Sequence, residues 1–92
     1  EGEIIDFLQK AYHDKVDGII INPGAYTHYS YAIYDALKAV LIPAVEVHLS
    51  DIHSREDFRK ISVTAPACIK QICGKGKEGY IEGLLYLLEY LK

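Results

Sequence analysis

The chain has 92 residues, of which half are apolar and a quarter are charged, and its net charge at pH 7 is −3. Such a composition is typical of one small globular domain and excludes a disordered chain. The ten Lys and Arg residues are scattered along the chain, so no basic stripe predicts nucleic-acid binding. No apolar stretch approaches the ~20 residues of a membrane span, and we expect neither nucleic acid nor a membrane as a partner.

The first half of the chain predicts two helices around one strand. Apolar residues recur at helical spacing over residues 2–14 and again over residues 29–40, where Thr27 is the expected N-cap. Between the helices, residues 18–21 form an apolar run that is too short for a helix and is typical of a strand buried on both faces.

The second half predicts two more strands and a closing helix. Strands are expected over residues 44–49 and 67–73, separated by a charged, irregular segment over residues 51–60, and a helix follows over residues 78–91. Apolar residues cover more than one stripe of this last helix, which predicts a second buried face against another chain or another part of the fold. The alternation indicates an α/β fold, an open parallel sheet with helices on both faces.

A three-stranded parallel sheet that opens on a helix is not a typical complete domain, because that helix should follow an earlier strand. We therefore interpret residues 1–92 as the C-terminal part of a single larger domain. The absent βαβ unit would account for ~30 or more residues.

The two cysteines, Cys68 and Cys73, lie five positions apart in the third predicted strand. An odd offset places their side chains on opposite faces, which predicts free thiols and no shared metal. The N-terminus shows no signal-peptide pattern, so we expect a cytoplasmic protein.

Residues 74–79 match the G-x-G-x-x-G pattern of dinucleotide-binding folds. That fingerprint also requires a second strand and an acidic residue ~20 positions onward, and the chain ends before that point. A glycine-rich turn between strand and helix is the favoured interpretation, and a phosphate-binding module is the alternative.

Polar residues follow two of the predicted strands. The first strand runs into Asn22 and His28, and the second alternates Glu46, His48 and Ser50 with apolar residues. Ligands of open parallel sheets bind at the carboxyl ends of the strands, and His suits proton transfer near neutral pH. A hydrogen-bonded core residue is the alternative for His48, but the carboxylate before it and the hydroxyl after it favour catalysis.

Four segments together resemble type II 3-dehydroquinate dehydratase: residues 1–6, 21–28, 46–53 and 55–59, which read EGEIID, INPGAYTH, EVHLSDIH and REDFR. The resemblance covers essentially the whole chain. It implies a flavodoxin-like fold that assembles as trimers grouped into dodecamers. It also implies dehydration of 3-dehydroquinate to 3-dehydroshikimate in the shikimate pathway, without a metal or an organic cofactor.

The resemblance also implies a role for each matching residue. His48 would be the general acid that protonates the departing hydroxyl, and Leu49 and Ser50 would bind the substrate carboxylate. Glu46 would orient its polar neighbours. The remaining substrate-binding residues would be Asn22, His28, Arg59 and Asp35, the last reaching into a neighbouring subunit's site, although its spacing alone predicts a solvated helix face.

The chain departs from the family in one respect. The family's N-terminal strand, with its Asn-Gly-Pro-Asn-Leu-Asn string, and the lid loop with its catalytic Arg and Tyr base have no counterpart in this sequence. We therefore expect the chain alone to be inactive and to need the N-terminal segment of the same enzyme as a partner. A non-catalytic flavodoxin-like binding or assembly module is the alternative function.

Overall fold

The computed structural model describes residues 1–54 and 56–92, without the side chains of Phe58 and Arg59. Its three strands form one parallel sheet in the order β1-β2-β3. The strands are β1 (Ile19–Ile21), β2 (Ala44–His48) and β3 (Lys70–Cys73). The predicted α/β class with an open parallel sheet is confirmed.

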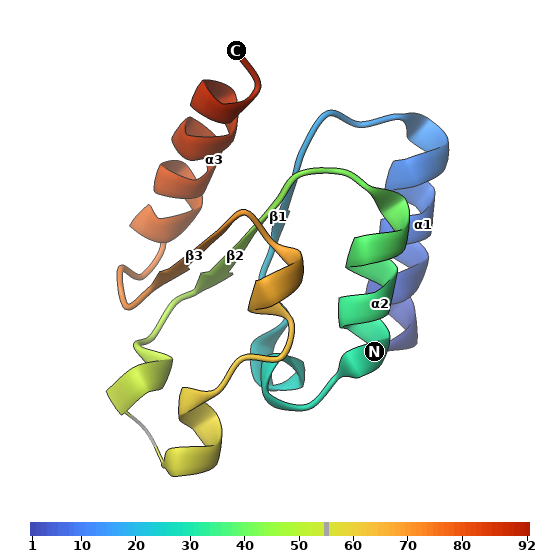
Figure 1. Cartoon of the computed structure of the whole chain (residues 1–92). Helices are drawn as coiled ribbons and strands as arrows, with labels where there is room; N and C mark the ends of the chain where they lie inside the picture. Colours follow the sequence, from blue (N-terminus) through green and yellow to red (C-terminus); the bar gives the residue numbers. More distant parts are fainter. Residues whose placement is uncertain (55) are drawn as a thin grey trace.

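Among the residues that the structure describes, three α-helices cover the two faces of the sheet. Helices α1 (Gly2–Asp14) and α2 (Tyr31–Val40) lie side by side on one face, and α3 (Glu78–Tyr90) lies on the other (Figure 1). Short 3-10 helices follow the carboxyl ends of β1 and β2, at the lower end of Figure 1. In the described part of the chain, no helix is long and apolar enough to cross a membrane.

Two predicted boundaries are wrong. The N-cap of α2 is Ser30, whose hydroxyl accepts a hydrogen bond from the backbone N–H of Ile33 at 3.1 Å, and not Thr27. Residues Gly24–His28 form a separate 3-10 helix before α2, and Thr27 is buried within it. The third strand begins at Lys70 because Ala65–Ala67 form another 3-10 turn around Pro66.

The sheet separates two apolar layers. Side chains of β2 alternate between its faces, so Val45 and Val47 pack toward α3 while Ala44 packs toward α1 and α2. Glu46 and His48 share the face of Ala44, and both are buried. The central strand therefore carries one apolar face and one face that ends in ionisable groups.

Helix α3 approaches the sheet closely because two glycines face it. A Cβ atom at Gly79 would lie 3.0 Å from Cγ1 of Val47, and one at Gly83 would lie 3.3 Å from Cγ1 of Val45. The outer side of the same helix exposes large apolar side chains. They include Ile81, Leu84, Leu85 and Leu88.

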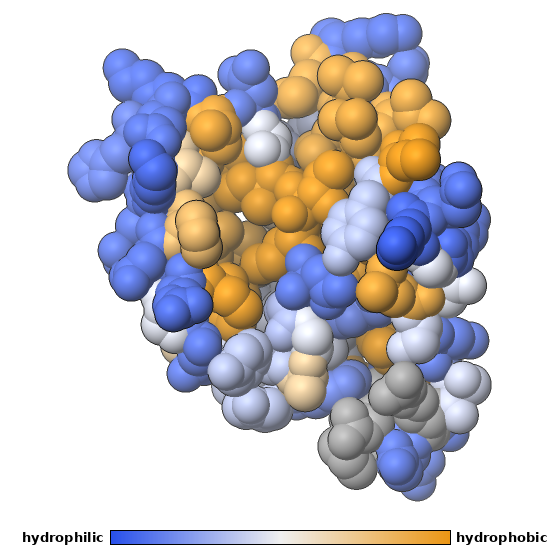
Figure 2. Space-filling view, turned by 180° about the vertical axis from the view of Figure 1, so that it is seen from behind, coloured by the Kyte–Doolittle hydropathy of each residue, from blue (hydrophilic) through white to orange (hydrophobic). Residues whose placement is uncertain are grey.

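A second uncovered apolar surface lies beside β1, which pairs only with β2 among the described residues. A groove of about 220 Å³ runs between α1 and β1. Its wall includes Phe7, whose side chain is 71% exposed. Figure 2 shows apolar atoms gathered at the centre and upper right of one side of the molecule. The sheet edge at β1 is thus open and flanked by apolar surface.

We predict that Gly83→Val lowers the free energy of unfolding by about 1–3 kcal/mol, because the added side chain would have to push α3 off the sheet. Urea unfolding measures this change. Leu84→Val, at the neighbouring exposed position, is the control and should change stability by less than about 0.5 kcal/mol. Equal effects of the two substitutions would contradict the close approach.

Candidate active site

A cavity of about 290 Å³ opens at the carboxyl ends of β1 and β2. Polar side chains from both strand ends and from the 3-10 helix after β1 line it. The lining residues are Asn22, Gly24, Ala25, His28, His48, Leu49, Ser50 and Ile52. The cavity lies where ligands bind in open parallel α/β sheets.

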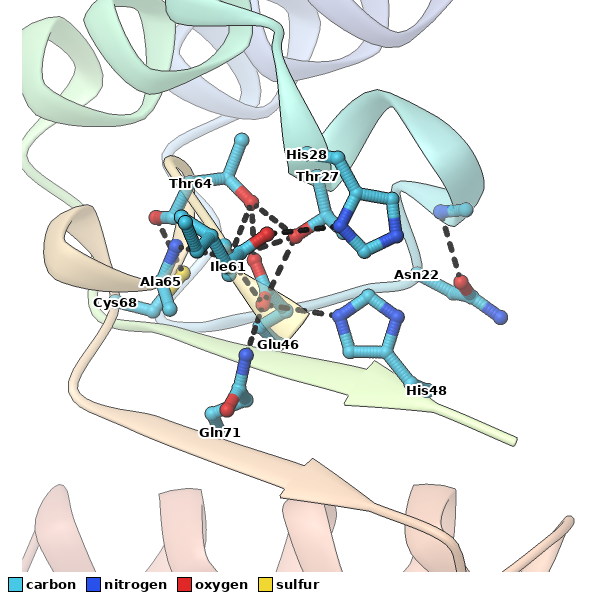
Figure 3. A network of polar contacts seen from close by, with 12 residues as sticks. Asn22, Thr27, His28, Glu46, His48, Ile61, Thr64, Ala65, Cys68 and Gln71 are labelled. Atoms are coloured by element: carbon cyan, nitrogen blue, oxygen red, sulfur yellow. Dashed lines mark hydrogen bonds and ion pairs between the residues drawn. The ribbon is translucent and has the colours of Figure 1, made fainter. Parts of the chain in front are cut away.

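The centre of the site is the pair formed by Glu46 and His48 (Figure 3). Both belong to β2 and lie two residues apart, so they point to the same face. The Nε2 atom of His48 lies 2.9 Å from Oε2 of Glu46. Glu46 is fully buried and His48 is 5% exposed, so water screens this pair poorly.

Glu46 is surrounded by hydrogen-bond donors from three other segments. Its Oε2 accepts hydrogen bonds from the hydroxyls of Thr27 (3.1 Å) and Ser62 (2.9 Å) and from Nε2 of Gln71 (2.8 Å). Its Oε1 accepts a hydrogen bond from the hydroxyl of Thr64. Every polar atom of the carboxylate therefore has partners, as a buried charge requires.

These contacts keep Glu46 ionised. Burial acts to raise the pKa of Glu46, but the hydrogen bonds from His48, Thr64, Gln71 and Ser62 outweigh burial and lower that pKa to about 2. An ionised carboxylate can only accept hydrogen bonds, so His48 carries a proton on Nε2. The other ring nitrogen, Nδ1, lies on the side of the ring away from Glu46 (Figure 3).

Segment 61–64 crosses over the 3-10 helix after β1 and brings its hydroxyls to Glu46. The backbone N–H of Val63 donates to the carbonyl of Thr27 at 2.7 Å. Beside it, Nδ1 of His28 donates to the carbonyl oxygen of Ile61 at 2.8 Å, which fixes the orientation of the His28 ring. Asn22 is held in turn by the backbone N–H of Gly24, which donates to its Oδ1 at 3.0 Å.

The glycine-rich turn after β3 supports the end of β2. The backbone N–H groups of Gly74 and Gly76 donate to the carbonyl oxygens of His48 (3.2 Å) and Leu49 (3.0 Å). Both glycines have positive φ angles, +76° and +55°, a conformation that glycine adopts readily. These N–H groups hold the strand end that carries His48, and a phosphate would have to displace those bonds to bind here.

The structure brings together five of the predicted site residues, which are Asn22, His28, His48, Leu49 and Ser50. Asp35 does not reach this cavity and lies exposed on α2. The side chain of Arg59 lies outside the described residues. In the described part of the chain, no three His, Cys, Asp or Glu side chains gather as metal ligands, and both cysteines are free.

Sequence reasoning missed the donors to Glu46. Thr27 was expected to cap a helix, and Ser62, Thr64 and Gln71 were not predicted to have a role. The sequence does contain a signal for Gln71, because a polar side chain within a predicted strand favours a hydrogen-bonding partner on a neighbouring strand. The structure shows this partner, since the register places Gln71 opposite Glu46.

Comparisons with known proteins point to one enzyme family. Residues 1–88 match the family described as Dehydroquinase class II. The chain is 74% identical over 81 residues to the 3-dehydroquinate dehydratase of Clostridium beijerinckii, covering 88% of this chain and 56% of that protein. It is 66% identical over 90 residues to the 3-dehydroquinate dehydratase of Fusobacterium nucleatum, covering 98% of this chain and 61% of that protein.

The fold resembles solved structures as well. The type II dehydroquinase from Butyrivibrio crossotus superposes with a TM-score of 0.93 at 57% identity, covering 96% of this chain and 61% of that one. The type II dehydroquinase from Propionibacterium acnes superposes with a TM-score of 0.89 at 37% identity, and the match covers 97% of this chain and 65% of that one. The chain thus spans somewhat more than half the length of the relatives it matches.

We predict a loss of stability in acid that depends on Glu46. Its pKa is lower in the folded protein than the ordinary value of 4.5, so the unfolded chain takes up the proton first as the pH falls. The stabilisation is present above about pH 4.5 and is lost toward pH 2. A drop in pKa from 4.5 to about 2 corresponds to about 3 kcal/mol.

Urea unfolding at pH 6, 4 and 3 measures this loss, and Glu46→Gln should remove it. Glu89→Gln, in an exposed ion pair with Lys92, is the control and should keep the acid dependence. A 13C NMR titration of the Glu46 carboxyl group in the unsubstituted protein reports the pKa directly, even if Glu46→Gln folds poorly. A carboxyl that titrates near pH 4.5 would contradict the prediction.

Proposed function

The chain belongs to the class II dehydroquinase family, and we propose that it forms the general-acid half of a 3-dehydroquinate dehydratase active site. One observation carries the proposal. The His48–Glu46 pair is buried at the carboxyl end of β2 and opens on a cavity that Asn22, His28 and Ser50 also line. This arrangement offers an acid and polar groups for a hydroxylated substrate in one place.

The proposed reaction removes water from 3-dehydroquinate and gives 3-dehydroshikimate. A base takes a proton from the carbon beside the ketone, the electrons form an enolate, and the hydroxyl on the next carbon leaves as water when an acid protonates it. We assign the protonation to His48. Its Nε2–H would stay bonded to Glu46, and the proton given to the departing hydroxyl would be the one on Nδ1, on the side of the ring away from Glu46, which leaves the ring neutral. Hydrogen-bond donors near the ketone oxygen would stabilise the enolate.

Substrate recognition is proposed for the remaining predicted residues. Leu49 and Ser50 would bind the carboxylate of the substrate, since both line the cavity directly after His48. Asn22 and His28 would contact its other polar groups, and the same role for Arg59 rests on the family resemblance. The resemblance also leads us to expect that the reaction needs no metal or organic cofactor.

The base would come from the part of the enzyme that this chain does not contain. We propose that an N-terminal segment of the same enzyme adds a strand to the edge of β1 and carries the Tyr base and the lid Arg. Two features support this proposal. The groove beside β1 has an apolar wall, and Asn22 lines both this groove and the cavity. A parallel strand in the groove would therefore deliver its carboxyl end to the site.

Assembly into trimers and dodecamers is also proposed. The exposed position of Asp35 on α2 leaves it able to reach a neighbouring subunit's site, and the apolar outer side of α3 gives a surface for burial. A cytoplasmic location is proposed because both cysteines are free, as is usual in a reducing compartment.

We predict that the 92-residue chain alone has no dehydratase activity. Activity should appear when the unmatched N-terminal part of the Clostridium beijerinckii protein is added, as a separate chain or fused before Glu1. Formation of the enone product is followed by its ultraviolet absorbance. Full activity of the 92-residue chain by itself would contradict the division of the site.

In the completed enzyme, His48→Gln should lower kcat by about 10²–10⁴-fold, as expected for loss of a general acid. Binding of 3-dehydroquinate, measured by calorimetry, should persist. His53→Gln, at an exposed position outside the cavity, serves as the control and should leave kcat unchanged. A kcat of His48→Gln within twofold of the unsubstituted enzyme would rule out His48 as the acid.

A further inference from the structure

Tyr80 in the first turn of α3 contacts the active-site residue Asn22 across the end of the sheet. The Nδ2 atom of Asn22 lies 3.0 Å from the hydroxyl oxygen of Tyr80, and 58 positions separate the two residues. Tyr80 does not line the cavity. We propose that Tyr80 is a positioning residue that fixes the side-chain amide of Asn22 toward the substrate, an inference that rests on the proposed function.

The backbone decides the orientation of this amide. The N–H of Gly24 contacts one polar atom of the Asn22 side chain at 3.0 Å, and a backbone N–H can only donate. The contacted atom is therefore the carbonyl oxygen Oδ1, and Nδ2 must face Tyr80. The hydroxyl of Tyr80 consequently accepts one of the two amide protons.

Both ends of the amide are thus held by different elements. Gly24 fixes Oδ1 from the 3-10 helix after β1, and Tyr80 fixes Nδ2 from α3. Asn22 lines the cavity, so the second N–H of its amide is the donor that remains for a substrate oxygen. Without Tyr80, only the bond from Gly24 to Oδ1 would hold the amide, so the amide would be more mobile and the direction of that donor less well fixed.

The close packing of α3 places Tyr80 at this position. Gly79 precedes it, and a Cβ atom there would lie 3.0 Å from Cγ1 of Val47. Because Gly79 has no side chain, the first turn of α3 can lie directly against β2. The residue that it contacts there, Val47, immediately precedes His48. The hydroxyl of Tyr80 can then reach the end of β1 over the adjacent strand.

Tyr80→Phe tests the proposal, because it removes only the hydroxyl. In the completed enzyme we expect kcat/KM to fall about 3- to 10-fold, the loss typical of one hydrogen bond. Tyr86→Phe is the matched control. Tyr86 lies on the same helix with nearly the same exposure, 39% against 37%, and Phe preserves its ring contact with Lys70.

A double-mutant cycle separates positioning from a general structural role. If Tyr80 acts through Asn22, Tyr80→Phe should have no further effect on kcat/KM in the Asn22→Ala background. The melting temperature should change little, because the bond is exposed to solvent. A loss that is equally large in both backgrounds, or no loss in either, would overturn the proposal.

A second measurement does not depend on turnover. 15N relaxation of the side-chain amide of Asn22 should show greater mobility in Tyr80→Phe than in Tyr86→Phe or the unsubstituted chain. Unchanged amide mobility would refute the positioning role even in an active enzyme. If the completed enzyme fails to dehydrate 3-dehydroquinate, the proposed function fails, while the relaxation data still decide the role of Tyr80.

Discussion

The buried carboxylate of Glu46 is the constraint on which the rest of the site depends. A charge in the central strand of a sheet is tolerated only where donors replace water. Here they come from the 3-10 helix after β1, from segment 61–64, from β3 and from β2 itself. The charge can be buried only if all these segments reach the same carboxylate. The hydrogen bonds to Glu46 therefore hold the loops of the site against the sheet.

The same constraint explains why the site can be ordered before any ligand binds. Each hydroxyl around Glu46 also contacts a second hydroxyl, as Thr27 does with Ser62 and with Thr64, both at 2.7 Å. Removing one donor therefore disturbs the others. His48 receives its orientation from this network, and the carbonyl at its own backbone is held by Gly74. The side chain of the proposed acid is therefore held by Glu46 and its backbone by Gly74, through separate hydrogen bonds.

The sequence was sufficient to predict the elements that follow local rules. Helical spacing located α1 and α3 almost to the residue, and the period of two placed Glu46 and His48 on one face. The N-cap of α2 shows where local rules fail. Thr27 and Ser30 are both acceptable caps, but the hydroxyl of Thr27 is used by Glu46, a partner 19 positions away. Segment 61–64 was beyond prediction for the same reason, since only the folded chain shows which carboxylate its hydroxyls meet.

The two uncovered apolar surfaces differ in what they can accept. The outer side of α3 offers exposed apolar side chains but, as part of a helix, no free backbone hydrogen-bonding groups. It can therefore pack against a helix or against another subunit without requiring a particular backbone conformation. The groove beside β1 adds to an apolar wall a strand edge that is unpaired among the described residues, so it suits an extended segment with complementary backbone hydrogen bonds. A segment that pairs with β1 in the parallel direction of the sheet would end beside Asn22. Under the proposed function, an extended segment along this edge would therefore complete the sheet and the site together, because Asn22 at the end of β1 lines both the groove and the cavity.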